Sequence, residues 1–323
     1  MPAPLRAASV ALFATSAHAD ADACMAGGSG SSAACLVQPA GTASPPPCES
    51  ERFSSLLAWV QEAAEQDILP VARATLPQLE EIMDMRCPIE GPRGVFLRRD
   101  LARGQYLMRI PVRRLMHAGF FRHGEAKEAL AEANAEALGL TEMLRLKVQD
   151  DPSMEQDVSE DTWLALYLLE QRKLGGSSLW GPYMNLLPKK LPSWVGFWSK
   201  KERTLLRGTQ FEAKYTRNLK VLQDQSQLVS DALPGLIGEG PPHELMLAMA
   251  WLKSRSFIVQ GMLDANTTRE HGTLLMMPIA DSFNHGERAH LDYAWNQTTQ
   301  TLDWWALEDM HVGTELLSYY GDE

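Results

Sequence analysis

The hydrophobic pattern of this chain changes period twice, which constrains the fold more than any other feature. Two short strands, 95–97 and 106–110, follow glycine turns near the start of the patterned region. The middle is typical of helices, because alanine, glutamate and leucine predominate and apolar residues recur three or four positions apart. Within it, Ser199-Lys200-Lys201-Glu202 predicts a capping box that opens a helix ending at Gly208. We therefore predict an α+β fold of short β-strands in small sheets, interrupted by a helical insertion at about residues 121–254. The alternation typical of strands returns after this insertion, at 274–277, 291–295 and 302–306.

Residues 1–50 differ in composition from the rest of the chain. Alanine, serine, glycine and proline dominate there, and charged side chains are rare. Such a composition cannot bury a core, so we predict a disordered leader followed by one folded domain over residues 51–321. A short apolar run after Arg6 and the small residues at 17–19 resemble a targeting segment. An organelle such as the plastid, the cytoplasm and the nucleus therefore all stay open as compartments.

Composition and charge argue against several classes of protein. The 323 residues are 45% hydrophobic and 22% charged, as in ordinary globular proteins. The formal net charge of −11 argues against a nucleic-acid groove. No apolar run approaches the roughly 18 residues that a membrane helix needs. We expect a monomer that binds neither nucleic acid nor a membrane.

Cysteine and histidine spacing gives little support for a metal site. Cys87 is the only cysteine in the predicted folded domain, so we expect that domain to be reduced. A metal enzyme is kept as a hypothesis because histidines and aspartates crowd near the C-terminal end, although without a known ligand spacing. These residues are His271, Asp281, His285, His290 and Asp292.

Two short motifs near the C-terminal end carry a resemblance to a known family. One ends in Asn284-His285 and the other, after a predicted strand, in Tyr320-Gly321. With the segments upstream of them, they resemble the SET-domain protein methyltransferases, in the subfamily that includes the Rubisco large-subunit lysine methyltransferase and the actin-histidine methyltransferase. The upstream segments are Arg93-Gly94-Val95-Phe96 with Gly104 and Ile110-Pro111, similar to an N-terminal hairpin, then Trp180-Gly181-Pro182-Tyr183, similar to the family's inserted helices, and Ser254-Arg255-Ser256-Phe257.

The resemblance implies a binding site for S-adenosylmethionine (AdoMet). It implies a backbone clamp at Arg93 and Gly94, where the missing side chain permits close approach. It implies that Asn284 bonds the ammonium or carboxylate of the cofactor. It also implies that the backbone of His285 meets the adenine while the His285 ring packs under the strand. The guanidinium of Arg255 would suit the carboxylate. The implied cofactor-binding residues are therefore Arg93, Gly94, Arg255, Asp281, Asn284 and His285.

The resemblance further implies methyl transfer to a lysine of a protein substrate. A lysine must lose its proton before it attacks, and a narrow apolar channel favours the neutral amine. Tyr320 is the implied catalytic residue, with a hydroxyl that orients the nitrogen. Phe257 and Tyr319 are the implied substrate-channel residues. Because Phe257 is apolar where the histidine-methylating branch has a polar side chain, we expect a lysine acceptor.

The chain stops soon after the second motif, whereas the family normally continues with a further helix and a helical substrate-binding domain. We therefore expect a C-terminally truncated chain whose last residues fray. The alternative function is a non-catalytic or weakly active SET-fold binding module that lacks the C-terminal substrate-binding domain.

Overall fold

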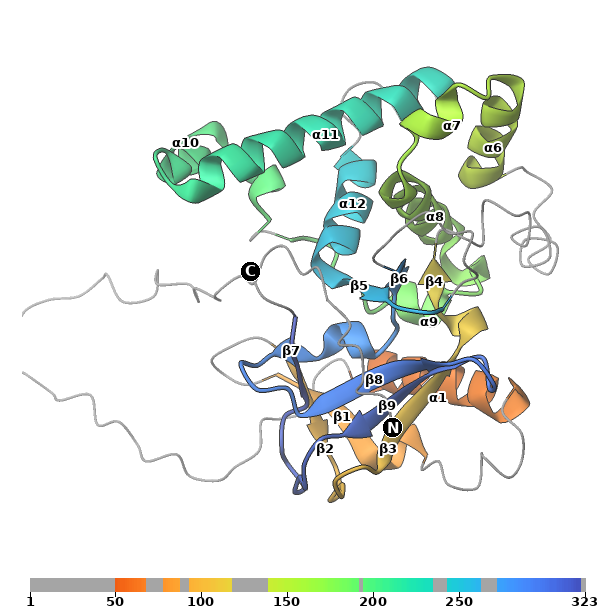
Figure 1. The fold of residues 1–323 in the computed structure, drawn as a ribbon, viewed down its shortest axis with the longest axis vertical. Helices are drawn as coiled ribbons and strands as arrows, with labels where there is room; N and C mark the ends of the chain where they lie inside the picture. The colour runs from red at the N-terminus through yellow and green to blue at the C-terminus, as the bar shows by residue number, and fades with distance from the viewer. Residues whose placement is uncertain are drawn as a thin grey trace, which may run out of the picture.

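The computed structural model describes residues 50–67, 78–87, 93–117, 139–191, 194–234, 243–262 and 272–320. Most helices gather in one half of the molecule and most strands in the other, with the first helix lying against the strands (Figure 1). Because the strands form small sheets among these helices, the predicted α+β fold class is confirmed.

The described strands make four small sheets. Three are antiparallel, with the orders β1-β2, β3-β9-β8 and β4-β6-β5, and one is the parallel pair β7-β10. The strands are β1 (Met83–Arg86), β2 (Gly94–Leu97), β3 (Tyr106–Pro111), β4 (Met116–His117), β5 (Ser256–Val259), β6 (Thr273–Met276), β7 (Asn284–His285), β8 (Leu291–Asn296), β9 (Thr301–Ala306) and β10 (Leu317–Ser318).

The prediction of an N-terminal hairpin is wrong. β2 pairs with β1, a strand that was not predicted, and β3 pairs with β9 in another sheet. The chain turns at Gly104, whose φ of 77° suits glycine. Its amide donates to the carbonyl of Ala306 at 2.8 Å, which aligns β3 with β9 instead of β2.

The helices follow local signals in the sequence only in part. The predicted capping box is present, since the Ser199 hydroxyl accepts from the Glu202 amide at 3.2 Å and the Glu202 carboxylate accepts from the Ser199 amide at 2.6 Å. The helix that it opens ends at Arg203 and passes into a 3₁₀ turn, earlier than the predicted end at Gly208. Part of the helical pattern before residue 139 lies outside the described residues. The helices are α1 (Ser50–Asp67), α3 (Leu79–Ile82), α6 (Leu140–Asp150), α7 (Met154–Asp157), α8 (Glu160–Leu174), α9 (Gly181–Met184), α10 (Lys200–Arg203), α11 (Gln210–Ala232) and α12 (His243–Arg255), with 3₁₀ turns η1 (Val112–Arg114), η2 (Gly175–Ser177), η3 (Val195–Phe197), η4 (Thr204–Leu206) and η5 (Ala280–Ser282).

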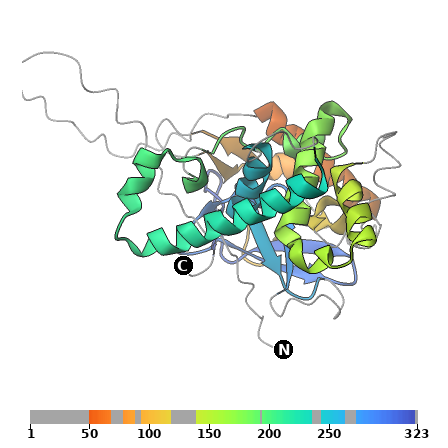
Figure 2. The same cartoon turned by 90° about the horizontal axis from the view of Figure 1, so that it is seen from above.

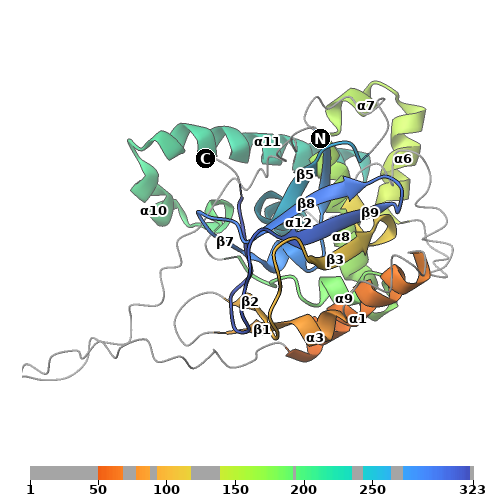
Figure 3. The same cartoon turned by 60° about the horizontal axis from the view of Figure 1, so that its bottom comes forward.

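One hydrophobic core connects the two halves. Helix α8 is buried continuously from Thr162 to Gln171 and packs against α12, while α1 lies along β3 (Figure 3). A helix that is buried all round belongs to the middle of a core. Because α12 ends at Arg255 and β5 begins at the next residue, this packing holds Arg255 where the helical half meets the strands.

The expectation of a reduced domain is wrong. The structure places Cys87 in a disulfide bond. The other three cysteines lie outside the described residues. Among the described helices, none is both long and apolar enough to cross a membrane.

Candidate functional site

The two C-terminal motifs lie side by side in the fold. Strand β10 runs parallel to β7, with Leu317 opposite Asn284 and Ser318 opposite His285. Just before β10 the chain runs antiparallel to β2, where the Leu316 amide donates to the Val95 carbonyl at 2.8 Å. Three segments that are far apart in the sequence therefore meet at one place.

The Glu315 carboxylate, the Asn284 amide and Gly94 lie together at this meeting point of the three segments. The Asn284 side-chain nitrogen donates to the Arg93 carbonyl at 2.9 Å and to Glu315 Oε1 at 2.6 Å. A β-carbon on Gly94 would lie 2.2 Å from the same Glu315 oxygen, so a larger residue would displace that carboxylate from its present position. Both hydrogens of the Asn284 amide are thus engaged within the protein, and its oxygen has no partner among the described residues.

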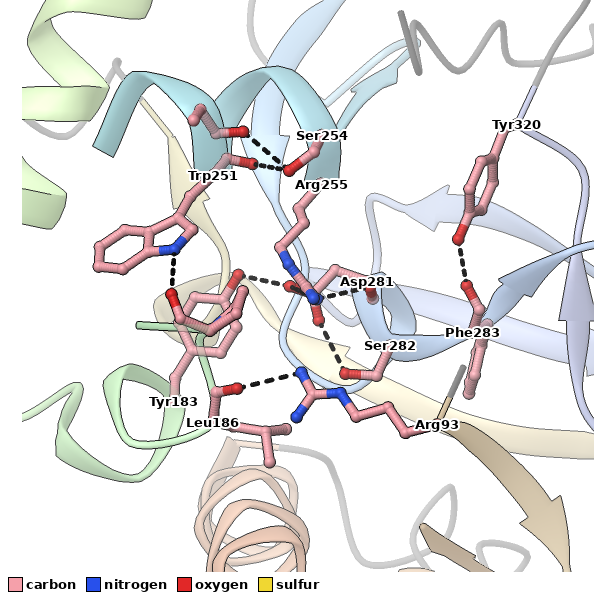
Figure 4. Close-up of polar contacts among 12 residues, drawn as sticks. Arg93, Tyr183, Leu186, Trp251, Ser254, Arg255, Asp281, Ser282, Phe283 and Tyr320 are labelled. Atoms are coloured by element: carbon pink, nitrogen blue, oxygen red, sulfur yellow. Dashed lines mark hydrogen bonds and ion pairs between the residues drawn. The ribbon is translucent and has the colours of Figure 1, made fainter. Parts of the chain in front are cut away.

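Arg255 contacts a buried carboxylate. Its Nη1 donates to the Asp281 carbonyl at 2.9 Å and lies 3.3 Å from Asp281 Oδ2 (Figure 4). The fully buried Tyr183 also donates to Asp281 Oδ2, at 2.8 Å. Burial, together with this carboxylate, raises the pKa of Tyr183 well above its ordinary value, so its hydroxyl stays protonated. The Nε and Nη2 groups of Arg255 have no partner within the described part of the chain, so one edge of the guanidinium is still able to donate.

The Arg93 side chain joins the strands to the helical half. Its Nη2 donates to the Leu186 carbonyl, just beyond α9, at 3.1 Å (Figure 4). The backbone carbonyl of Arg93 accepts from the Asn284 side chain. The position that was predicted as part of a backbone clamp therefore also fixes the two halves to one another.

Tyr320 follows β10 and reaches back toward η5. Its hydroxyl donates to the Phe283 carbonyl at 2.5 Å (Figure 4). Burial raises the pKa of Tyr320 to about 12, against the opposing effect of the Arg255 guanidinium. The hydroxyl is thus protonated at neutral pH, and with its hydrogen engaged its oxygen is available as an acceptor.

His285 and Tyr319 lie on the exposed side of the motif. The His285 ring centroid lies 5.7 Å from that of Tyr319 and 5.2 Å from that of Tyr320. His285 Nδ1 accepts from the Tyr320 amide at 3.3 Å. The His285 ring was expected to pack beneath the strand. Instead it is exposed to solvent, because the strand β7 is only two residues long.

Phe257 belongs to an aromatic cluster in the core. It is 4% exposed, and its ring packs edge-on against Tyr293 and Trp304. Phe283 packs against Trp304 in the same way and accepts the Tyr320 hydrogen bond through its carbonyl. The cluster therefore supports the backbone to which Tyr320 is bonded.

Two residues at this place were not predicted as members. Tyr183 stands in a segment that the resemblance assigned only to the inserted helices, and Glu315 looked like part of a strand. A local sequence signal existed for neither, because their partners lie 98 and 31 residues away. The metal hypothesis gains no support: among the described residues, no group of three or more His, Cys, Asp or Glu side chains is placed to hold a metal ion.

Comparisons with known proteins identify the fold. No family model matches the chain, and no curated protein matches its sequence. Among solved structures, the SET domain of LSMT bound to lysine and AdoHcy has a TM-score of 0.58 at 16% identity, over 85% of this chain and 54% of that one. Rubisco LSMT bound to AdoMet has a TM-score of 0.56 at 17% identity, over 83% and 52% of the two chains. The chain thus spans about half the length of these structures, and it has the fold of a SET domain.

Proposed function

We propose that this chain is an AdoMet-dependent protein-lysine N-methyltransferase. The observation that carries the proposal is the pairing of β7 with β10, which brings Asn284, Glu315 and Tyr320 together beside Arg255. The similar solved structures are described as bound to AdoMet, and to lysine with AdoHcy. Their shared fold gives a reason to look for the same ligands in this chain.

The polar groups fit the amino-acid end of AdoMet. When bound, AdoMet supplies a methyl group on a positively charged sulfur, and it also carries an ammonium and a carboxylate. Asn284 Oδ1 and Glu315 Oε2 have no partners among the described residues and are acceptors, as an ammonium requires. The remaining edge of Arg255 is a donor and suits a carboxylate. Asn284 therefore acts through its oxygen, because its nitrogen is engaged by Arg93 and Glu315.

Tyr320 fits the orientation of an attacking amine. Its hydrogen is donated to the Phe283 carbonyl, so its oxygen accepts a hydrogen from the neutral lysine and directs the nitrogen lone pair. With a pKa of about 12, the hydroxyl does not act as a base at neutral pH. The substrate lysine would lose its proton to water, and the protein would supply position. The partner implied is a protein that bears the acceptor lysine.

Binding and transfer are to be measured separately. Calorimetry should show that the purified chain binds AdoMet with one-to-one stoichiometry and that Asn284→Ala weakens binding. Incubation of the chain with tritiated AdoMet and a protein extract, followed by mass spectrometry, should locate the methyl group on lysine.

Each of the other outcomes has a distinct meaning. AdoMet binding without transfer to any protein would identify a SET-fold binding module. A methyl group found on histidine would show that the acceptor is assigned wrongly. No AdoMet binding at all would contradict both the enzyme and the module.

A further inference from the structure

A segment of the helical half carries an unusual charge. Between Lys200 and Lys220 there are seven lysines and arginines and only two acidic residues, in a chain whose formal net charge is −11. The segment comprises α10, η4 and the first half of α11, which extend to the edge of the molecule in two views (Figures 1 and 2). We call residues 200–220 the basic arm.

Most cations of the basic arm have no partner in the protein. The two acidic residues are engaged by backbone amides: Glu202 accepts from Ser199 at 2.6 Å and Glu212 from Gly208 at 2.8 Å. Lys220 pairs with Asp224, and Arg203 donates to the Trp198 carbonyl. The exposed cations without a partner among the described residues are Lys200, Lys201, Arg207, Lys214 and Arg217.

A cavity of about 120 Å³ lies at the root of the basic arm, between α11, α12, η3 and the start of α8. Its lining is mainly apolar and includes Trp194, Leu222 and Met249, and Lys253 forms an ion pair with Asp161 at one side. Val221 also lines it and is 53% exposed, so the cavity reaches the surface on that flank of α11. Since a cavity of roughly 150 Å³ holds benzene, this one fits a single apolar side chain.

Charge and cavity share one face of α11. Lys214, Arg217 and Val221 follow i, i+3, i+7 spacing, so the two cations stand beside the mouth of the cavity. The Tyr215 hydroxyl at the cavity is inaccessible to solvent and has no hydrogen-bond partner among the described residues.

We propose that the basic arm and this cavity form a docking site for an acidic protein segment that inserts one apolar side chain. The unpartnered cations complement acidic residues, and the cavity takes the anchor. A nucleic acid has no apolar side chain to fill the cavity. A membrane surface would contact the exposed Leu205 and Phe211 of the arm, but it would leave the apolar lining of the cavity unfilled. The inference goes beyond methyl transfer and does not require it.

Peptide binding tests the docking site without any enzymatic readout. The probe is a fluorescein-labelled peptide with a central leucine flanked by glutamates, titrated with the full chain at low salt. Because each exposed charge contributes modestly, we expect Lys214→Glu to raise the Kd roughly threefold to tenfold. The matched control is Lys147→Glu, which reverses an exposed helical lysine in α6, outside the basic arm, and should leave the Kd unchanged. Added salt should weaken binding to the wild type, since the pairs are exposed.

The apolar half of the site has its own test. Val221→Asn should weaken binding of the leucine peptide but have no effect on a peptide with glycine in place of the leucine. Equal binding of a lysine-flanked peptide, or an equal effect of Lys214→Glu and Lys147→Glu, would overturn the proposal. So would tighter, Lys214-dependent binding of a single-stranded oligonucleotide or of phosphatidylserine vesicles. A Lys214-dependent dimer in sedimentation would instead assign the face to a second copy of the chain.

Discussion

Charged side chains are used in opposite ways at the candidate site and on the basic arm. At the site, Arg255 and Glu315 are bonded to neighbouring groups, and Asp281 is buried among its partners. On the basic arm, Lys214 and Arg217 are exposed and lack partners within the described residues. The bonds at the site fix the positions of the side chains before a ligand binds, whereas the unpaired cations of the basic arm can form ion pairs with a binding partner.

This difference predicts how each region responds to substitution. Removing one member of a buried network leaves the other members without partners. The loss of unfolding free energy is then larger than the net contribution of the hydrogen bond itself. Removing an exposed, unpaired charge costs the fold almost nothing. Substitutions at the site should therefore alter stability, cofactor binding or turnover, and those on the arm should alter association alone.

The largest effect is expected from Asp281→Ala. The change leaves the Tyr183 hydroxyl buried without an acceptor and Arg255 without its carboxylate. Breaking a buried pair in this way costs about 3–5 kcal/mol of unfolding free energy. Urea denaturation measures the loss.

Asp281→Asn is the matched control for this prediction. It keeps an acceptor for Tyr183 and removes only the charge, so its loss of stability should be smaller. A loss of less than about 1 kcal/mol in Asp281→Ala would show that the site is not a buried network in the sense argued above.

The next effect concerns Glu315, which was found only from the structure. Glu315→Gln keeps an acceptor for Asn284 but removes the negative charge that would face the ammonium of AdoMet. Hydrogen bonds to charged groups contribute about 1.5–3 kcal/mol, so AdoMet affinity should fall by that amount. Calorimetry should find no change in Glu287→Gln, which alters an exposed carboxylate of the neighbouring loop. Equal affinities of Glu315→Gln and the wild type would remove Glu315 from the cofactor site.

Tyr320→Phe should lower turnover about tenfold or more while AdoMet affinity stays nearly constant, because the hydroxyl orients the amine mainly in the transition state. The effect is measured by single-turnover kinetics, with the acceptor protein identified by mass spectrometry as the substrate. Tyr106→Phe, a change on β3, serves as the control and should keep full turnover. Unchanged turnover in Tyr320→Phe would contradict the proposed role.

The raised pKa of Tyr320 predicts a smaller, pH-dependent effect on the unfolding free energy. Its pKa rises from 10.0 to about 12 on folding, so the folded chain binds the proton more tightly. The resulting stabilisation is complete below pH 10 and is lost as the pH rises toward 12. In urea titrations at alkaline pH, Tyr320→Phe should lose less stability over this interval than the wild type does. Parallel pH curves for the two proteins would contradict this assignment.

The sequence predicted local elements better than their partners. The strands predicted at 291–295 and 302–306 are present as β8 and β9, because alternation is a local property of the sequence. The pairing of β2 with β1, and of β3 with β9, was missed because pairing depends on residues far along the chain. The predicted hairpin failed for this reason.

The candidate site shows the same limit. The motifs that end in Asn284-His285 and Tyr320-Gly321 were recognisable because their residues are contiguous, and the structure sets β7 beside β10. Glu315 and Tyr183 do not belong to a contiguous motif, and only their hydrogen bonds to Asn284 and Asp281 in the structure place them at the site. The roles of the predicted site residues in binding and catalysis stay predictions until the substitutions are made.

The smallest effect on the unfolding free energy is expected for substitutions on the basic arm. Lys214→Glu reverses an exposed charge that has no partner among the described residues, so the unfolding free energy should change by no more than about 0.5 kcal/mol. AdoMet affinity should also stay constant, because the arm does not contact Arg255, Asn284 or Glu315 in the bonds that define the site. Urea denaturation and calorimetry on the same preparation check both values. A stability loss comparable to that of Asp281→Ala would mean that the arm belongs to the structural network, and the contrast between a fixed site and a free docking surface would be wrong.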